Sequence, residues 1–389
     1  MDLRGVPSSV LEALQGAARV LGISRLALVG GVVRDQLLHQ RCGRAWSGVP
    51  DLDWVVEGDA AALVAELIRQ VGSERITDVQ EHGAFGTVSF RLDGLSLDLA
   101  TARQEHYPAP AQNPVVQAGT LQADLARRDF TVNAMALDLV ANELIDLHHG
   151  SEDLETGQLR FLHAGSVQDD PTRVIRAARY AARLGFQLAE ESSKQIRSTI
   201  QNWPWAWRRG HPAMAAPPAL ATRLRMELER LLEREPWPKA LDLLEQWQAL
   251  PLLDPQLQND PRRTQRLQWA RRLGLPLMPT LLLGAADPVA VAQRLQIPGK
   301  QLQWLQQCGA LRDWLVETPP PLGASPSIWS TALEQKGWQP EAVALAVTLR
   351  PNQWRPLLRW WGRWRVIQAP QTARDLILSL IHISEPTRP

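Results

Sequence analysis

Hydrophobic positions along the chain change their spacing near residue 170. Before that point, short apolar segments with strand composition recur at residues 25–29, 52–56, 86–90 and 95–99. A Gly-Gly turn follows the first of them and leads into a helix expected over 32–38. From about residue 170 onward the spacing is helical, in segments rich in Leu, Ala, Arg, Gln and Trp. The pattern predicts an α+β fold class, with a mixed-sheet head followed by an all-α remainder.

Proline-rich segments interrupt the helical part at residues 202–219 and 318–321. We therefore expect a head over 1–146, a helical segment over 147–230 that contains the 202–219 linker, and a further helical region over 231–370. The remaining segment, 371–389, is expected to be non-native or truncated. Its last residues, 379–389, lack helical spacing and a stop signal and are similar to translated adapter sequence, so we expect the natural C-terminus to be missing.

The composition excludes several classes of protein. An apolar fraction of 45% with 21% charged residues is ordinary for a globular protein. Apolar runs stay below the roughly 18 residues that a membrane span needs, and the first residues lack the apolar core of a signal peptide. Two widely separated cysteines, Cys42 and Cys308, favour neither a disulfide framework nor a cysteine metal site, which fits a reducing cytoplasm. With a net charge of +1, any nucleic-acid partner requires a local concentration of positive charge.

A strand, a glycine turn and a helix start follow one another in LVGGVVRD, residues 28–35. At such a turn, backbone N–H groups and the positive end of the helix dipole can bind a phosphate. Gly30 and Gly31 form the turn, and Arg34 in the first helical turn offers a bidentate guanidinium. Two glycines in this position are also typical of a plain tight turn, so the motif alone does not decide between the two interpretations.

Two carboxylates open the next strand, in DLDWVV, residues 51–56. Residues i and i+2 of a strand point to the same face, so Asp51 and Asp53 are expected side by side. Adjacent carboxylates repel each other unless a cation neutralises them, and hard oxygen ligands suit Mg²⁺ that bridges to substrate phosphates. A turn aspartate and a solvent-facing aspartate would explain the same pair. Asp98, on a later strand, is expected either as a third carboxylate at the metal or in a structural role.

A third motif is RRDFTVNAMA, residues 127–136. Arg128 can pair with a phosphate, while Asp129 and Asn133 carry groups that can hydrogen-bond ribose hydroxyls. A helix N-terminus with a capping pair would account for the same residues when they are taken alone.

The segment DDPTRVIRAARY, residues 169–180, predicts a helix that begins with an acidic pair and a proline. Proline suits the first helical turn, and Asp169 or Asp170 can accept hydrogen bonds from the free backbone N–H groups there. A spacing of three residues then places four charged side chains along one slowly drifting face: Asp170, Arg173, Arg176 and Arg179. Alone, this stripe is typical of a solvated helix face; together with a phosphate-binding turn and a carboxylate pair, it favours a nucleotide site.

Taken together, six strings resemble the class II tRNA nucleotidyltransferase and bacterial poly(A) polymerase family: LVGGVVRD, DLDWVV, RRDFTVNAMA, GSEDL with Arg160, DDPTRVIRAARYAARLGF and RLRMEL. They follow the family's order over about residues 26–230. The resemblance implies a polymerase-beta-like nucleotidyltransferase head followed by helical neck, body and tail domains, of which the helices at 231–370 bind tRNA. It further implies template-free addition of CMP and AMP to the tRNA 3′ end, with CTP, ATP and Mg²⁺, and with release of pyrophosphate.

The same resemblance implies roles for individual residues. Asp51 and Asp53 would hold the metal ions, and Asp170 with Arg173 would recognise the base. Asp169, where the family usually has Glu, would be a cap or a structural residue. The residues placed around the nucleotide are Gly30, Gly31, Arg34, Arg128, Asp129, Asp170, Arg173, Arg176 and Arg179.

The chemistry of the bases supports recognition by one Asp/Arg pair. Cytosine and adenine both carry an exocyclic amine next to a ring nitrogen acceptor, so a carboxylate accepts from the amine while an arginine donates to the ring. UTP and GTP place a carbonyl where the amine would be, which opposes two acceptors at a cost of about 1 to 3 kcal/mol. Selection of C and A therefore needs no nucleic-acid template.

Other functions stay open from the sequence alone. A poly(A) polymerase would share the head motifs, although residues 81–87, EHGAFGT, are similar to the tRNA enzymes. Residues 101–110 resemble a loop of some A-adding members, so addition of CC alone or of A alone is an alternative. A non-catalytic RNA-binding protein would use the aromatic and basic clusters at 203–209 and 354–365, although tryptophans in helical domains are more often core residues. Such a protein would be expected to lose Asp51 and Asp53, and both are present.

Overall fold

The computed structural model describes residues 3–46, 48, 52–83, 86–202, 218–321 and 323–367. The chain divides into two compact units, Met1–Asn259 and Asp260–Pro389. Four predictions fall wholly or mostly outside the described residues: the carboxylate of Asp51, the linker at 202–219, the aromatic cluster at 203–209 within it, and the C-terminal segment 371–389.

Unit 1 contains a seven-stranded mixed sheet with the strand order β3-β4-β5-β2-β1-β8-β9. Its strands are β1 (Leu26–Val29), β2 (Leu52–Val56), β3 (Ile76–His82), β4 (Thr87–Leu92), β5 (Leu95–Thr101), β8 (Ala136–Asp138) and β9 (Glu143–Ile145). Within this sheet β2 and β5 pair in parallel, and the other neighbours pair in antiparallel fashion. The strands predicted at 25–29, 52–56, 86–90 and 95–99 are confirmed within one or two residues.

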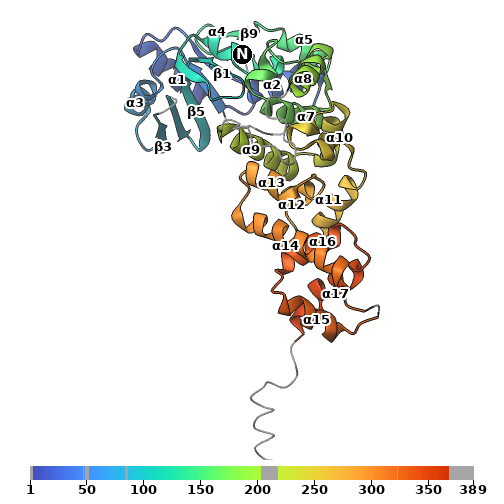
Figure 1. Cartoon of the computed structure of the whole chain (residues 1–389). Coiled ribbons are helices and arrows are strands. Elements are labelled where there is room, and N and C mark those ends of the chain that lie inside the picture. Colours follow the sequence, from blue (N-terminus) through green and yellow to red (C-terminus); the bar gives the residue numbers. More distant parts are fainter. Residues whose placement is uncertain are drawn as a thin grey trace, which may run out of the picture. The chain divides into compact units, whose positions relative to one another are not determined.

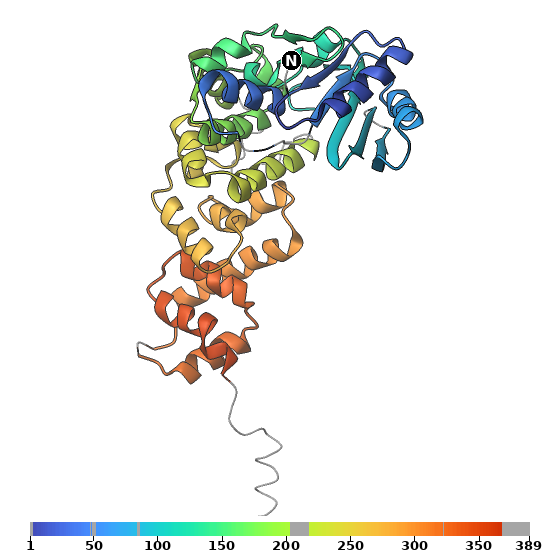
Figure 2. The same cartoon turned by 180° about the vertical axis from the view of Figure 1, so that it is seen from behind.

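Helices cover the sheet and supply its core. The helices α1 (Ser8–Val20) and α3 (Ala60–Val71) pack against each other, and α3 also packs against β4 and β5 (Figure 2). The short helix α4 (Leu121–Ala126) places two leucines on a sheet face made of small apolar residues of β1 and β2. All four residues of β1 are buried, as expected for a central strand with both faces covered. The glycine turn at the end of β1 leads into α2 (Gly31–Cys42), which confirms the predicted helix and extends it.

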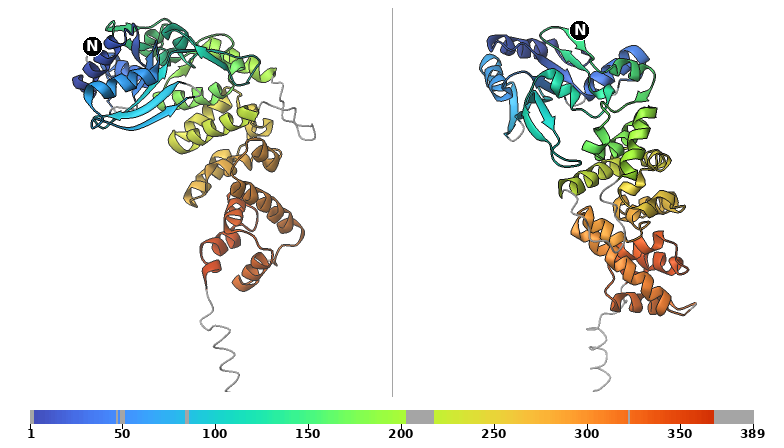
Figure 3. Two further views of the ribbon diagram at one scale, coloured as in Figure 1. Left: turned by 90° about the vertical axis from the view of Figure 1, so that its left-hand side faces the viewer. Right: turned by 45° about the horizontal axis from the view of Figure 1, so that its top comes forward.

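Among the described residues, the polypeptide after the sheet is helical, as predicted, apart from one short parallel strand pair, β10 (Gln158–Leu159) with β11 (Gln187–Leu188). In unit 1 it forms the 3-10 turns η2 (Leu250–Leu252) and η3 (Pro255–Asn259), and the helices α5 (Gly150–Glu155), α6 (Ser166–Asp169), α7 (Thr172–Leu184), α8 (Glu190–Gln201), α9 (Pro218–Arg234) and α10 (Trp237–Gln246). A further 3-10 turn, η1 (Thr131–Asn133), comes before β8. Figure 3 shows the yellow helices of this unit below the blue strands of the sheet. Because α7 packs against both α9 and α10, the boundary expected after residue 230 falls inside this unit.

A small hairpin connects the sheet to these helices. Its strands are β6 (Arg103–His106) and β7 (Val115–Ala118). In the loop between them, the backbone N–H of Ala111 donates to the carbonyls of Gln168 and Asp169 at 3.2 Å each. Arg223 of α9 donates to the carbonyl of Ala111 at 2.8 Å. The hairpin loop is therefore anchored on α6 and α9, next to the start of α7.

Unit 2 is a group of helices (Figure 1). They are α11 (Arg263–Arg272), α12 (Leu277–Leu282), α13 (Pro288–Arg294), α14 (Gly299–Glu317), α15 (Pro326–Gln335), α16 (Pro340–Thr348) and α17 (Trp354–Gly362), followed by the 3-10 turn η4 (Trp364–Val366). Its central element is α16, which is buried along most of its length and packs against α11, α14 and α17. In the part of the chain that the structure describes, no helix combines the length and apolar character needed to cross a membrane.

Candidate active site

The glycine turn lies directly against two of the predicted site residues. Gly30 has φ 76°, a conformation that favours glycine, and its position caps the N-terminus of α2. A Cβ atom at Gly30 would lie 3.1 Å from Nη1 of Arg128 and 3.8 Å from Oδ2 of Asp53. The absence of a side chain at Gly30 therefore leaves a helix N-terminus, a guanidinium and a carboxylate open to one shared space.

The parallel pairing of β2 and β5 brings two carboxylates together. Asp53 and Asp98 are Cα partners in this register, so their side chains leave the sheet on the same face. Asp53 is exposed and Asp98 is half-buried. Carboxylate oxygens on neighbouring strands form a donor set that suits a hard divalent cation. Among the described residues there is no group of three potential metal ligands, and Asp51, the other predicted ligand, lies outside them.

Arg128 is held in place by a buried carboxylate that the sequence analysis did not single out. Asp124 of α4 is fully buried and accepts from Nη2 of Arg128 at 3.0 Å and from Nη2 of Arg127 at 2.7 Å. Arg127 also donates to Glu105 of the hairpin at 3.0 Å. The Nε of Arg128 is buried and has no hydrogen-bond partner within the described part of the chain, so this arginine keeps a donor for a ligand. The spacing of three and four residues from Asp124 to the two arginines is the pattern in the sequence that could have predicted these ion pairs.

The start of α7 separates the roles of the two adjacent aspartates. Asp170 has an extended backbone, with φ −138° and ψ 93°, and its Oδ1 accepts from the backbone N–H of Thr172 at 3.2 Å and from the Thr172 hydroxyl at 2.7 Å. Asp169 is instead the last residue of α6, and its carboxylate lies 3.8 Å from Nε2 of His163. The expectation that Asp169 caps this helix is therefore wrong, because the extended residue directly before Pro171 is Asp170.

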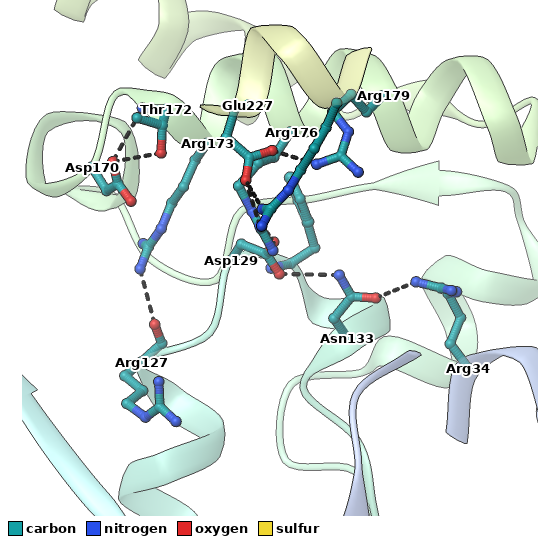
Figure 4. Close-up of polar contacts among 12 residues, drawn as sticks. Arg34, Arg127, Asp129, Asn133, Asp170, Thr172, Arg173, Arg176, Arg179 and Glu227 are labelled. Atoms are coloured by element: carbon teal, nitrogen blue, oxygen red, sulfur yellow. Dashed lines mark hydrogen bonds and ion pairs between the residues drawn. The ribbon is translucent and has the colours of Figure 1, made fainter. Parts of the chain in front are cut away.

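The two side chains expected to recognise the base have unused polar groups. The second oxygen of Asp170, Oδ2, has no hydrogen-bond partner in the residues that the structure describes. Arg173 is buried, and it donates from Nη2 to the carbonyl of Arg127 at 2.9 Å and from Nη1 to the carbonyl of Ser166 at 3.4 Å. Each of these nitrogens carries a second N–H. A rigidly held donor and a rigidly held acceptor therefore lie one helical turn apart (Figure 4).

Arg176, Asp129, Asn133 and Arg34 form one continuous chain of contacts (Figure 4). Arg176 donates to Oδ2 of Asp129 from Nε at 2.8 Å and from Nη2 at 2.5 Å. The other oxygen of Asp129 accepts from the Asn133 amide at 3.0 Å, and the Asn133 carbonyl accepts from Arg34 at 2.7 Å. Burial alone would raise the pKa of Asp129, but the charge of Arg176 and the hydrogen bonds outweigh it and hold this pKa below its usual range. The chain of contacts favours the ionised form of Asp129 and fixes its ion pair with Arg176 in the wall of the site.

Arg34 and Asn133 are oriented by this chain in a way that the sequence did not reveal. Arg34 is buried, it also pairs with Asp35 at 2.8 Å, and its guanidinium lies 5.3 Å from the ring centroid of Tyr180. Asn133 lines the cavity described below, whereas Arg34 is not among the lining residues. A direct contact of Arg34 with phosphate stays a prediction, and in this structure Arg34 supports Asn133.

Arg179 pairs with two carboxylates, one from α9 and one from the link between α9 and α10. It donates to Glu227 of α9 and, at 3.2 Å, to Glu235. Glu227 also accepts from Arg176 at 3.2 Å and from Arg230 at 2.7 Å. Both glutamates are buried. Their separation from Arg179 in the sequence, 48 and 56 residues, explains why a pattern along the chain did not reveal the pairing.

These elements surround one cavity of about 460 Å³ in unit 1. Tyr107 of the hairpin loop and Arg223 and Arg230 of α9 line it without having been predicted as site residues. Burial raises the pKa of Tyr107, so its hydroxyl stays a neutral donor near neutral pH. The cavity is lined by Gly30, Gly31, Asp53, Glu105, Tyr107, Arg127, Arg128, Asp129, Asn133, Asp170, Thr172, Arg173, Arg176, Tyr180, Arg223, Met226, Glu227 and Arg230.

Sequence comparisons identify a family model and relatives that are similar to this chain. The model of the Poly A polymerase head domain matches residues 26–160. A CC-adding tRNA nucleotidyltransferase of Deinococcus radiodurans is 38% identical over 294 residues, which cover 70% of this chain and 67% of that protein. An A-adding tRNA nucleotidyltransferase of Aquifex aeolicus is 41% identical over 179 residues, which cover 45% of this chain and 20% of that protein. The chain thus spans between a fifth and two thirds of the length of these two relatives.

A comparison with solved structures supports the same fold for the whole chain. The structure of a CCA-adding enzyme in an apo form matches with a TM-score of 0.71 at 24% sequence identity, over 99% of this chain and 89% of that chain. The mixed-sheet head followed by helices, predicted from the change in hydrophobic spacing, is therefore confirmed as a nucleotidyltransferase fold.

Proposed function

Because the chain belongs to the tRNA nucleotidyltransferase and poly(A) polymerase family, we propose that it adds CMP and AMP from CTP and ATP to the 3′ end of tRNA, with release of pyrophosphate. One observation carries the proposal. A single cavity brings the glycine turn and Asp53 together with Asp170 and Arg173. A nucleoside triphosphate needs contacts of both kinds, at its phosphates and at its base.

Recognition of the base rests on the start of α7. Oδ1 of Asp170 is engaged by Thr172, so Oδ2 is the atom that accepts from the exocyclic amine of cytosine or adenine. Arg173 donates to the ring nitrogen next to that amine, and its two backbone acceptors keep the guanidinium from turning away. A carbonyl in place of the amine opposes Oδ2 and costs about 1 to 3 kcal/mol, which excludes UTP and GTP by roughly ten- to a hundredfold.

The phosphates lie at the other end of the same cavity in this proposal. Backbone N–H groups at the start of α2 and the guanidinium of Arg128 bind the triphosphate. Asp51 and Asp53 would hold Mg²⁺, with Asp98 next to Asp53 as a third carboxylate. When bound, Mg²⁺ activates the attacking hydroxyl and stabilises the leaving pyrophosphate. The 3′ oxygen of the tRNA forms the new bond to the α-phosphorus as the bond to pyrophosphate breaks. The residues of the chain position these groups and form no covalent bond with the substrate.

Partial addition is the second candidate, and one observation favours it. The two relatives described above are named for CC addition and for A addition, and the CC-adding protein aligns over the longer stretch of this chain. The head motifs serve CTP and ATP alike, so addition of CC alone or of A alone uses the same cavity. A cytoplasmic location fits the proposed tRNA substrate and the two unpaired cysteines.

The test is a sequencing assay of products. The purified chain is incubated separately with each of the four nucleoside triphosphates and with CTP plus ATP, on tRNA that lacks CCA, on tRNA that ends in CC, and on a generic RNA. Full CCA on the first tRNA supports the primary proposal, while addition that stops after CC, or that requires the CC end, supports the second. A long adenylate tail on the generic RNA contradicts both. The Asp53→Ala variant provides the inactive control.

A further inference from the structure

A buried carboxylate behind the nucleotide cavity contacts two of the arginines that line it. Asp124 is fully buried and does not line the cavity itself. Its Oδ1 accepts from Nε of Arg127 at 3.0 Å and from Nη2 of Arg127 at 2.7 Å, and its Oδ2 accepts from Nη2 of Arg128 at 3.0 Å. Asp124 therefore acts on a bound nucleotide without touching it, through its charge and through the orientation of these two arginines.

The two arginines lead from Asp124 to different ends of the cavity. Nη1 of Arg128 lies 3.1 Å from where a Cβ atom would stand at Gly30, so Arg128 belongs to the proposed phosphate end. The backbone carbonyl of Arg127 accepts from Nη2 of Arg173 at 2.9 Å, so Arg127 supports the proposed base end (Figure 4). Asp124 thus has a direct contact with a residue of the first end and with the support of the second.

Packing does not by itself fix the side chains of Arg127 and Arg173. Besides the nucleotide cavity, both line a neighbouring cavity of about 470 Å³, so each borders open space on two sides. The orientation of the Arg127 guanidinium instead depends on two carboxylates, Asp124 and, at 3.0 Å, Glu105 of the hairpin. Asp124 lies on α4, whose two leucines are buried in the core of the sheet, so the fold alone sets its position.

We propose that Asp124 is a positioning residue for both ends of the nucleotide site, so that this carboxylate sets phosphate binding and base selection together. For the identity of the ligand, the inference rests on the proposed function. Residues three and four positions apart lie on one side of a helical turn, which lets a single carboxylate pair with both guanidinium groups. Charge-assisted hydrogen bonds hold the fork of each arginine more firmly than neutral partners would.

The sign of the effect on binding separates orientation from charge. In Asp124→Asn the site loses one negative charge, which by itself strengthens the attraction for an anionic triphosphate. The new amide has one oxygen acceptor in place of two, and its N–H₂ group opposes the N–H groups of one arginine, which then loses its fixed orientation. If Asp124 acts by positioning, binding weakens although the site has become more positive.

The main test measures binding without RNA, so that no nucleotide is incorporated. Calorimetry in the presence of Mg²⁺ compares the affinities of wild type and Asp124→Asn for inorganic tripolyphosphate, CTP and UTP. We expect tripolyphosphate to bind about tenfold or more weaker, because a hydrogen bond to a charged group contributes that much. The ratio of CTP affinity to UTP affinity should fall about three- to tenfold, because Arg173 loses part of its support.

Two further variants separate the two ends. Arg128→Gln should weaken tripolyphosphate binding and keep the ratio of CTP affinity to UTP affinity. Arg127→Lys keeps the charge but loses the planar fork, so it should lower this ratio and bind tripolyphosphate about as tightly as wild type. Both variants retain Asp124, and the side chains that they replace are only half-buried, so they decide the question even if Asp124→Asn does not fold.

The matched control is Asp138→Asn, which removes another buried carboxylate from an ion pair. Asp138 pairs with Arg25 at 2.6 Å and does not line the nucleotide cavity. Melting temperatures are recorded for all variants. Asp138→Asn should lower the melting temperature and leave both binding measurements at their wild-type values.

Tighter or unchanged tripolyphosphate binding in Asp124→Asn overturns the proposal. An unchanged ratio of CTP affinity to UTP affinity, in Asp124→Asn or in Arg127→Lys, also overturns it, because Asp124 would then act on the phosphate end alone. Equal losses in Asp138→Asn would reduce the effect to general destabilisation and overturn it as well. A wild-type chain that binds CTP in preference to UTP but adds no nucleotide to tRNA contradicts the proposed function and leaves this inference standing.

Discussion

The first turn of α7 and its later turns use the same residue types in different ways. Asp170 and Arg173 line the cavity and are held by a hydroxyl, a backbone N–H and two backbone carbonyls. One turn later, Arg176 pairs with Asp129, and Arg179 pairs with Glu227. Neutral contacts leave the charge of the first pair available, whereas carboxylate contacts neutralise the second.

The difference shows how one stripe of charges can be divided between recognition and support. A group that must discriminate between ligands needs a fixed orientation and an open hydrogen-bonding position, which neutral backbone partners provide. A group that must hold two segments together needs a strong charged partner, which Asp129 and Glu227 provide from other elements. Changes at the start of α7 should therefore alter selectivity, and changes in its later turns should alter stability.

The largest effect is expected outside α7, at the carboxylate that serves the reaction itself. Asp53→Ala should lower incorporation by about a thousandfold or more, because it removes a ligand of the metal that stabilises the leaving group. Binding of tRNA should stay close to wild type. Incorporation is measured with radiolabelled CTP and ATP, and Glu12→Ala on the exposed side of α1 is the control. Incorporation above a tenth of the wild-type rate would rule out Asp53 as a metal ligand.

For the later turns of α7, the comparison predicts that removal of Arg176 lowers the folding stability. Arg176→Met leaves the buried carboxylate of Asp129 without its charged partner, which should lower the free energy of unfolding by about 3 to 5 kcal/mol. Urea unfolding followed by circular dichroism measures this, and Arg197→Met on the exposed side of α8 is the matched control, expected within about 0.5 kcal/mol of wild type. An Arg176→Met variant as stable as the control would place Arg176 with the recognition residues instead.

The sequence predicted the elements that depend on local pattern. Apolar runs located β1, β2, β4 and β5, and the Gly-Gly turn located the start of α2. It could not predict partners that tertiary folding brings together. Arg34 was expected at a phosphate, yet Asp35, Asn133 and the Tyr180 ring orient it into the wall, and Asn133 is 99 residues away.

The distinction between the two aspartates before α7 shows the same limit at short range. Both residue types suit a cap, so composition did not separate them. The backbone decides, because Pro171 favours an extended residue before it, and an extended Asp170 directs Oδ1 to Thr172. Gly30, Asp53, Arg128, Asp170 and Arg173, which the sequence assigns to one site and which line one cavity, belong to short motifs that each fold locally. Their roles there stay a prediction.

For the start of α7, the comparison predicts that a substitution of Asp170 changes nucleotide selectivity and has little effect on stability. In Asp170→Asn, the carbonyl can keep the Oδ1 contacts with Thr172, which turns the amide N–H₂ toward the cavity. Discrimination against UTP and GTP should fall by roughly ten- to a hundredfold, because an amide donor satisfies their carbonyl. Competition assays with mixed nucleotides measure this. The matched control, Asp169→Asn, should keep wild-type selectivity, and a selectivity loss there equal to that of Asp170→Asn would mean that the base is recognised elsewhere.

The smallest effect is expected in the pH dependence of the stability that the Asp129–Arg176 pair contributes. The pKa of Asp129 is lowered in the folded chain, so its ionised form stabilises the fold at pH values above its unfolded pKa of about 4, and this contribution is lost as pH falls through the folded pKa. The lower limit of the constant range is about pH 5, one unit above that unfolded pKa. From there to about pH 7, the free energy of unfolding of the wild type should exceed that of Asp129→Asn by a constant amount. The difference should shrink below about pH 4. Urea unfolding at a series of pH values tests this. If the difference in free energy of unfolding between wild type and Asp129→Asn stays constant down to about pH 3, one unit below that pKa, Asp129 is not held ionised by Arg176.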